Sequence, residues 1–279
     1  MIDTLKKLHQ WFLNVGTIEK WQKIAAYEHF LTDLRAQVPD SLLLSGYGVF
    51  SQNDEDGIIQ EIFHRIGTTN KHAVEIAVGN GLESNTHLLL QTGWQCTWFE
   101  ATETNVSEIE QSFMSWLTSG TLKVVKSWVT ASTIEHFLAE AKIPKNIDLL
   151  SLDIDGQEYW LWQALTKWKP RVLITEYNAT LGPDVALTVP QNDTFAWDQR
   201  SIYCGASLAA FCILAKKKGY TLVCCNYTGV NAFFVRNDVL KKHFPVKTTE
   251  KLYQKPRIGG YVRPGYLRTV SNWITIDKQ

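Results

Sequence analysis

From residue 72 onward, short apolar segments typical of buried strands alternate with segments that have helical spacing. Strands are predicted at 72–78, 96–101, 121–129, 149–155 and 171–179, and helices at 83–92, at 104–117, from 132, and up to about 167. Such alternation is typical of a parallel sheet with helices on both faces. Two more strands, at 220–229 and 231–238, are joined by a Thr-Gly turn and predict an antiparallel hairpin. The sequence therefore predicts a doubly wound α/β fold with a mostly parallel seven-strand sheet.

Three parts are expected along the chain. Residues 1–45 form a helical addition, because apolar residues recur at helical spacing through most of them. This segment is either a lid or dimerisation arm, or a helix packed on the outside of the domain. Residues 46–240 form the α/β domain, which includes a helix at 58–67 that Gly67 ends. Residues 241–279 form a tail that packs on the domain.

Charge and cysteine content exclude several classes of protein. Lys plus Arg and Asp plus Glu both total 28, so no overall field favours nucleic acid or an anionic membrane. The five cysteines lack C-x-x-C spacing, which indicates reduced, buried thiols. No apolar run is long enough to span a bilayer, and the first residues do not have the pattern of a signal peptide. We therefore expect a cytoplasmic location.

Oxygen-bearing side chains end two of the predicted strands. Asp153 and Asp155 stand two residues apart at the end of LLSLDID, and Glu176 and Asn178 end the next strand in the same way. Because side chains in a strand alternate between faces, each pair points to one side. In α/β folds, ligands bind outside the carboxyl ends of the strands. The four side chains are thus expected to converge on one cleft.

These acids allow three interpretations. Asp153, Glu176 and Asn178, with Asp155 as a further candidate, could hold Mg²⁺ or another hard cation. Without a metal, one carboxylate could act as a general base, its pKa raised by its neighbour's charge. In the structural interpretation, Asp155 caps the next helix and Glu158 closes the capping box. A similar box is expected where Ser132 opens a helix and Glu135 follows three residues later.

A glycine turn follows the first strand. The segment VEIAVGNGLESNT places Gly79-Asn80-Gly81 between a strand and a helix, where backbone can approach a ligand closely. Ser84 occupies the third glycine position of the dinucleotide pattern. Glu100 ends the second strand, where a carboxylate can accept hydrogen bonds from both hydroxyls of a ribose.

The order of these motifs resembles the class I S-adenosylmethionine-dependent methyltransferases. The motifs are V-E-I-x-V-G-x-G, W-F-E, D-L-L-S-L-D-I-D-G-x-E, an apolar strand ending E-Y-N, and the C-terminal hairpin. The stretch Ser51-Gln52-Asn53-Asp54-Glu55-Asp56 is similar to that of the FkbM-like group. The resemblance covers about 50–240 and implies a Rossmann-like methyltransferase fold. Asp155 departs from the pattern, because that group usually carries Glu there.

The resemblance implies roles for individual residues. Glu75, Gly79, Asn80 and Gly81 would surround the methionine part of S-adenosylmethionine. Glu100 would hold the ribose, and Ser127 and Trp128 would border the adenine. Asp153 would lie beside the transferred methyl, and the candidate catalytic residues are Asp153, Asp155 and Glu176. The arrangement also resembles that of metal-dependent O-methyltransferases. This second resemblance implies that Asp153, Glu176 and Asn178 bind Mg²⁺ or Mn²⁺.

The expected activity is methyl transfer to a hydroxyl of a sugar, a glycoside or another small metabolite. Trp197 and Tyr203 are expected to offer flat faces above the cleft. Lys255, Arg257, Arg263 and Arg268 lie in a turn-rich tail that could clamp an anionic group of the acceptor. A homo-oligomer is compatible with the sequence. A nucleotide-cofactor oxidoreductase and a non-catalytic S-adenosylmethionine-binding module remain as alternatives.

Overall fold

The computed structural model describes residues 21–22, 24–198, 200–240, 243–245, 247–257 and 272–277. The chain forms two compact units, Met1–Ser45 and Gly46–Gln279. In the first unit, a helix runs through residues 24–37 and a 3₁₀ helix, η1, follows at Leu42–Ser45. The apolar residues predicted to continue this helix before residue 21 lie outside the described residues.

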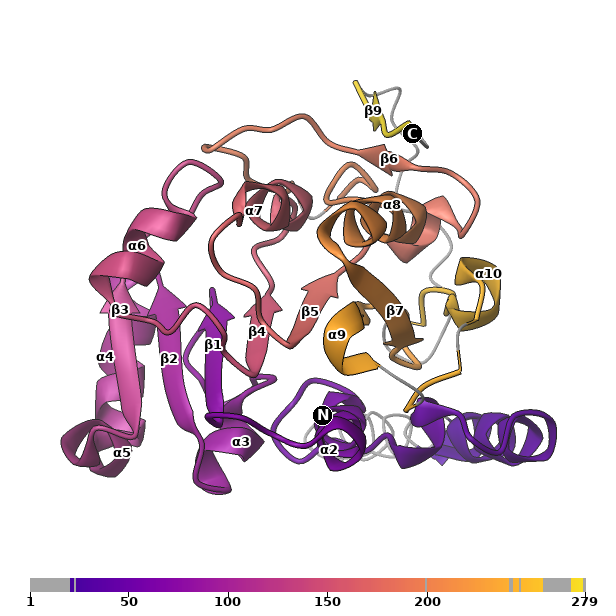
Figure 1. The fold of residues 1–279 in the computed structure, drawn as a ribbon, viewed down its shortest axis with the longest axis horizontal. Helices are drawn as coiled ribbons and strands as arrows, with labels where there is room; N and C mark the ends of the chain where they lie inside the picture. The colour runs from indigo at the N-terminus through magenta and orange to yellow at the C-terminus, as the bar shows by residue number, and fades with distance from the viewer. Residues whose placement is uncertain are drawn as a thin grey trace, which may run out of the picture. The chain divides into compact units, whose positions relative to one another are not determined.

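A seven-strand sheet organises the second unit (Figure 1), with strand order β3-β2-β1-β4-β5-β8-β7. Strands β1 to β5 are parallel, β8 pairs antiparallel with β5, and β7 pairs antiparallel with β8. The predicted sheet and its closing hairpin are therefore confirmed. The strands are β1 (His72–Ile76), β2 (Gln95–Glu100), β3 (Leu122–Lys126), β4 (Leu149–Leu152), β5 (Val172–Glu176), β7 (Tyr220–Cys225) and β8 (Asn231–Arg236).

Helices cover both faces of this sheet. In Figure 1, α7 and α8 lie above the strands and α2 and α3 lie below them. The helices are α2 (Glu55–Ile66), α3 (His87–Gln91), α4 (Glu103–Ser112), α5 (Met114–Ser119), α6 (Ile134–Glu140), α7 (Glu158–Ala164), α8 (Leu208–Lys218), α9 (Asn237–Leu240) and α10 (Thr249–Leu252), with a 3₁₀ helix η2 at Ala179–Leu181. None of the described helices is long and apolar enough to cross a membrane.

The buried strands supply side chains to both layers. Ile76 and Leu152 join the cluster that contains Trp162 of α7 and Phe211 of α8. Trp98 of β2 points to the other face of the sheet. Its ring contacts that of Phe113, with 4.9 Å between the ring centroids. Burial of each such side chain stabilises the fold by roughly 1.5–3 kcal/mol. All five cysteines are free, and Cys96, Cys224 and Cys225 are buried.

Three helix predictions were wrong in detail, each because a tertiary contact redirects the chain. The helix expected at 83–92 begins only at His87, because the backbone N–H groups of Asn85 and Thr86 bond the Glu75 carboxylate. The helix expected at 104–117 breaks at Phe113, whose ring packs between Trp98 and α3.

The third helix prediction that was wrong in detail is the capping box expected at Ser132. Helix α6 follows Thr133 and has no side-chain cap. The Glu135 carboxylate instead accepts the backbone N–H groups of Thr166 and Lys167. The Ser132 hydroxyl donates to Asp193, 61 residues away.

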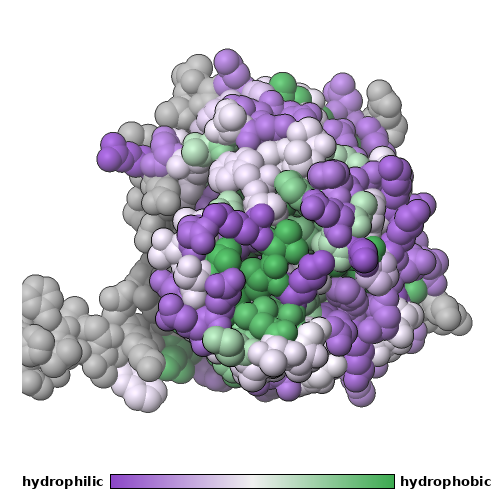
Figure 2. All heavy atoms as spheres, turned by 90° about the vertical axis from the view of Figure 1, so that its left-hand side faces the viewer, coloured by the Kyte–Doolittle hydropathy of each residue, from purple (hydrophilic) through white to green (hydrophobic). Residues whose placement is uncertain are grey.

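The sheet ends at β3, on the face that Figure 2 turns toward the viewer. Hydrophobic side chains gather near the middle of this face, and hydrophilic side chains surround them. Val124 and Val125 of β3 are half-buried, while Lys123 and Lys126 are exposed. Exposed lysines on an edge strand oppose pairing with further strands. Away from this sheet, β6 (Leu187–Thr188) and β9 (Ile274–Thr275) form an antiparallel pair that the sequence did not predict.

Candidate active site

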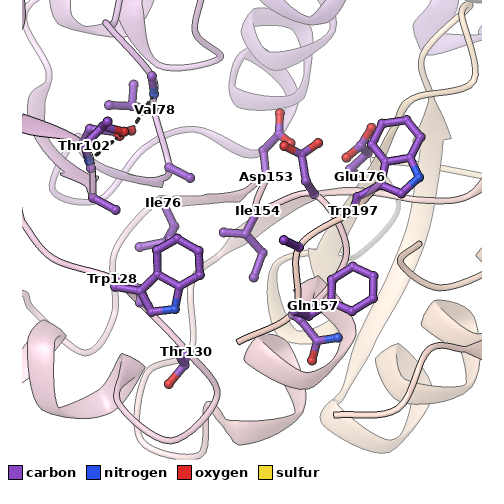
Figure 3. A pocket seen from close by; sticks show the side chains of 18 of the residues that line it. Ile76, Val78, Thr102, Trp128, Thr130, Asp153, Ile154, Gln157, Glu176 and Trp197 are labelled. Carbon is purple, nitrogen blue, oxygen red and sulfur yellow. Dashed lines mark hydrogen bonds between the residues drawn. The ribbon is translucent and has the colours of Figure 1, made fainter. Parts of the chain in front are cut away.

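A cavity of about 600 Å³ opens at the carboxyl ends of β1, β2, β4 and β5. In Figure 3, Trp128 and Trp197 lie toward opposite sides of the view, with Asp153 between them. The cavity is lined by Gln52, Ile76, Ala77, Val78, Gly79, Glu83, Glu100, Ala101, Thr102, Asn105, Ser127, Trp128, Val129, Thr130, Ala131, Asp153, Ile154, Asp155, Gln157, Glu176, Asn192, Asp193, Phe195, Ala196, Trp197 and Val230. Its volume is within the range of small-molecule sites.

Glu100 lies in the cavity wall where β2 ends. Its Oε1 accepts the backbone N–H of Thr102 at 2.8 Å and the Asn105 side chain at 3.2 Å. Its Oε2 accepts the backbone N–H of Gly79 at 3.0 Å. A carboxylate oxygen has two lone pairs, so Oε2 retains acceptor capacity toward the cavity. The backbone N–H of Gly79 therefore orients this carboxylate.

Ser127 and Trp128 line the same cavity, just after β3. The Ser127 hydroxyl oxygen is buried and has no hydrogen-bond partner among the described residues. A buried polar atom without a partner costs roughly 1–3 kcal/mol, so such an atom is usually satisfied by a water or a ligand. The Trp128 indole is 60% exposed, and its N–H donates to the Asp193 carbonyl at 2.9 Å.

Three carboxylates converge where β4 and β5 end. One oxygen each of Asp153, Asp155 and Glu176 lies within 4.8 Å of the others. Asp155 has φ +56°, a left-handed conformation that is rare outside glycine and is often found at functional sites. We call Asp153, Asp155 and Glu176 the carboxylate trio.

Glu158 supports this loop from the start of α7. Its Oε1 accepts the backbone N–H groups of Ile154 and Gly156, both at 2.9 Å. Asp155 therefore does not cap α7, and Glu158 does not close a box with it. The carboxylate of Glu158 instead fixes the turn that carries Asp155.

Burial, together with crowding of negative charge, raises the pKa values of these acids. Burial, followed by the charges of Glu158 and Asp155, raises the pKa of Asp153 from 3.8 to about 7. Burial is also the main cause that raises the pKa of Glu158 to about 7. The pKa of Glu176 is raised well above its ordinary value, by burial and then by the charge of Asp153. The group is therefore able to take up protons near neutral pH.

Residues 189–197, which we call the strap, form another part of the wall. The Gln157 side chain donates to the Pro190 carbonyl at 3.1 Å and accepts the backbone N–H of Asn192 at 2.9 Å. Gly156 has φ +138°, and a Cβ on it would come within 2.4 Å of the Phe195 ring. The strap is therefore held to the loop that carries the carboxylate trio.

Of the residues expected at the cofactor, Gly79, Glu100, Ser127, Trp128 and Asp153 line the cavity, whereas Glu75, Asn80 and Gly81 do not. The Glu75 carboxylate is buried, where it accepts hydrogen bonds from residues 84–86. The Asn80 side chain bonds Glu108. Gly81 faces away from the cavity and packs against Trp98, which a Cβ would approach within 2.5 Å.

Asn178 also differs from the expectation. Its side-chain amide donates to the carbonyls of Ile202 at 2.7 Å and Cys204 at 2.9 Å. Its oxygen accepts the backbone N–H of Thr180 at 3.1 Å, as the cap of η2. Both polar atoms of the Asn178 side chain therefore bond its own and a neighbouring loop, and the third carboxylate oxygen beside those of Asp153 and Glu176 comes from Asp155.

The basic tail is described only in part. Arg263 and Arg268 lie outside the described residues. Arg257 stacks on the Tyr227 ring at 4.4 Å and donates to Gln254 at 3.0 Å. It does not line the 600 Å³ cavity. Trp197 does, whereas Tyr203 lies outside that wall.

Known proteins offer similar folds rather than close relatives. No family model and no curated protein matches the chain. Among solved structures, an S-adenosylmethionine-dependent methyltransferase from Clostridium acetobutylicum is 12% identical, covering 64% of this chain and 89% of that one, with a TM-score of 0.42. A glycopeptide N-methyltransferase complexed with S-adenosylmethionine is 12% identical over 70% and 95% of the chains, with a TM-score of 0.39.

A methyltransferase from Streptomyces caelestis is 10% identical, covering 71% of this chain and 96% of that one, with a TM-score of 0.41. Identities and TM-scores this low carry no conclusion about what the chain does.

Sequence reasoning missed several lining residues. Thr102 and Asn105 follow Glu100 in E-A-T-E-T-N, where short polar side chains before a helix were a usable signal. Gln52 was noted only within the acidic stretch before the first strand. Within the strap, only Trp197 had been expected above the cleft, because the place of the other strap residues in the wall depends on Gln157 and Trp128, which are more than 30 residues earlier.

Proposed function

We propose that the chain is an S-adenosylmethionine-dependent methyltransferase that acts on a hydroxyl group. The observation that carries this proposal is that Glu100 and the carboxylate trio line one cavity of about 600 Å³. A carboxylate with spare acceptor capacity suits the ribose of a nucleoside. The trio suits a reaction that releases a proton.

The residues present fit this cofactor. Glu100 would accept hydrogen bonds from the ribose hydroxyls, and Ser127, whose buried hydroxyl lacks a partner, would bond the adenine. The exposed indole of Trp128 and the side chain of Val129 offer apolar surface for the adenine ring. When bound, S-adenosylmethionine supplies an electrophilic methyl group.

The trio would deprotonate the acceptor. One carboxylate of the trio would take the hydroxyl proton, while the cofactor, when bound, would supply the methyl group and keep the electron pair of the broken methyl–sulfur bond. The raised pKa of Asp153, caused by burial and nearby charge, matches a general base that works near neutral pH. A sugar or another small metabolite is the acceptor that we favour.

A divalent cation is part of the proposal. Asp153, Asp155 and Glu176 offer three oxygens to Mg²⁺ or Mn²⁺, with Asp155 in place of Asn178. A cation would offset the repulsion among the acids and lower the pKa of a hydroxyl beside it. Exhaustive chelation should then abolish turnover and leave cofactor affinity nearly unchanged. Full turnover after chelation would leave Asp153 as a metal-free base.

Calorimetry tests cofactor binding directly. Wild-type protein should bind S-adenosylhomocysteine and not NAD. Glu100→Gln should weaken binding by about 10- to 100-fold, because a charge-assisted hydrogen bond contributes roughly 1.5–3 kcal/mol. Glu103→Gln, which changes an exposed acid outside the cavity wall, is the matched control and should bind as the wild type does. Preferential binding of NAD would favour the oxidoreductase alternative.

A further inference from the structure

A second, smaller cavity of about 80 Å³ lies beside the carboxylate trio. Asp155, Glu176, Trp197 and Val230 line both this cavity and the 600 Å³ cavity. Asp155 and Glu176 of the trio therefore face two spaces, whereas Asp153 lines only the larger one. The larger one extends to Glu100, and the smaller one lies among the loops after β5, around residue 204 and between β7 and β8.

The walls of the small cavity offer little to an anionic ligand. Apolar or small residues supply much of the lining, namely Gly156, Ala179, Ile202, Cys204, Gly205, Gly229, Val230 and Pro256. No Lys, Arg or His is among the described residues that line it. The carboxylates of the trio would repel an anion when no cation is bound.

Polar groups in these walls already have partners within the protein. The Tyr177 hydroxyl donates to the Gln254 carbonyl at 2.7 Å. Glu158 and Asn178 make the hydrogen bonds to their own loops described above. A ligand in this cavity would therefore meet apolar contacts on most sides and carboxylates on one side.

We propose that the small cavity receives the hydroxyl-bearing end of the methyl acceptor and selects a neutral rather than an anionic group of a few heavy atoms. This proposal rests on the proposed function: with the cofactor in the larger cavity, an acceptor held here has its hydroxyl beside Asp155 and Glu176. An 80 Å³ space is about half of the roughly 150 Å³ cavity known to hold benzene. It therefore suits a short hydroxyalkyl group or the edge of a sugar ring, with the remainder of the acceptor outside.

Cys204 is the residue that we assign to size selection. It lines the small cavity and not the large one. Burial, followed by the charges of Glu176 and Glu158, raises the pKa of its thiol, so the side chain remains a neutral, compact group. A leucine at this position would occupy part of the cavity without touching the wall near Glu100.

Ligand-observed NMR on the complete chain with chelator present tests this assignment. The probes are propan-1-ol and propionate, which share a three-carbon skeleton and differ in charge. Propan-1-ol should bind saturably, at about millimolar affinity as expected for so few atoms. Propionate should bind at least about tenfold more weakly, which corresponds to 1.4 kcal/mol. This comparison uses wild-type protein and so does not depend on any variant folding.

Variants then locate the site. Cys204→Leu should weaken propan-1-ol binding at least about tenfold. Cys204→Ser keeps the size, and Cys212→Leu adds the same bulk on α8, away from both cavities; each should bind propan-1-ol as the wild type does. S-adenosylhomocysteine affinity, measured on every variant, should stay within about twofold, a free-energy change below 0.5 kcal/mol.

The outcomes separate the two proposals. If S-adenosylhomocysteine binds but propan-1-ol does not, or if Cys204→Leu leaves propan-1-ol binding unchanged, the acceptor cavity is overturned and the proposed function stands. Tighter binding of propionate than of propan-1-ol would overturn the selection of neutral groups. If S-adenosylhomocysteine fails to bind wild-type protein, the proposed function fails and the acceptor role falls with it.

Discussion

Replacing Asp153 by asparagine should stabilise the folded protein at about pH 8 in the presence of a chelator. Burial, and then the charges of Glu158 and Asp155, raises the pKa of Asp153 from 3.8 to about 7. A carboxyl with a raised pKa in the folded state contributes its full stability below its ordinary pKa. That contribution is lost as the pH rises through about 7. The ionised carboxylate therefore destabilises the fold in mildly basic solution.

The magnitude follows from this difference in pKa. Each pKa unit corresponds to about 1.4 kcal/mol, so full ionisation of a buried Asp153 would cost roughly 4 kcal/mol. Asp153 is partly open to the cavity, and it shares protons with Glu158 and Glu176, so one substitution relieves only part of this cost. We expect about 1–2 kcal/mol, which raises Tm by roughly 2–8 °C. The gain should shrink as the pH falls below about 7 and approach zero below the ordinary pKa of 3.8, where the carboxyl is protonated in both states.

Thermal unfolding measured between about pH 4 and pH 8 tests this prediction, with Asp148→Asn as the control. Asp148 is fully buried and accepts a hydrogen bond from Arg171 at 2.7 Å. Burial would raise the pKa of Asp148, but the hydrogen bonds from Arg171 and Thr69 outweigh it and lower that pKa. Its stabilisation is present above its ordinary pKa, so Asp148→Asn should destabilise by about 3–5 kcal/mol at neutral pH.

A lower Tm for Asp153→Asn at about pH 8 would refute the reasoning, as would a Tm difference that does not change with pH. Mg²⁺ supplies a further check. If the trio binds the cation, Mg²⁺ should raise the Tm of the wild type at this pH. The increase should be smaller for Asp153→Asn, which has lost one of the three carboxylates. The substitution should also lower kcat by about 100-fold or more, the scale of lost acid–base assistance.

Two glycines give further predictions. Gly81→Ala should destabilise the fold by at least about 1–3 kcal/mol without a direct effect on the cavity wall. The reason is that Gly81 has φ +76° and that its Cβ would lie within 2.5 Å of the Trp98 ring. Urea unfolding measures this loss, and unchanged stability would contradict the described packing. Gly156→Ala should instead displace the Phe195 ring from the cavity, because the two would come within 2.4 Å. S-adenosylhomocysteine should then bind about tenfold more weakly, which calorimetry measures, and unchanged affinity would remove the strap from the cofactor site.

The sequence alone determined the sheet and the position of its acids along the chain. Apolar segments of strand length, separated by helical spacing, leave few topologies other than an α/β sheet. The same alternation predicted that Glu100, Asp153 and Glu176 end strands at one edge. These are local properties, because the period of a strand and the end of an apolar run can be read from adjacent residues.

Only the tertiary structure decided what each strand-end side chain does. Glu75 and Asn178 also carry side-chain oxygens, but the Glu75 carboxylate accepts the backbone N–H groups of residues 85 and 86, and the Asn178 amide donates to carbonyls of the loop near residue 204. Asp155 joins the trio because a left-handed backbone turns its carboxylate inward, and Glu158 fixes that turn. A buried polar group bonds whichever partner the fold places beside it. For these residues the partners come from other segments of the chain, so local sequence could not identify them.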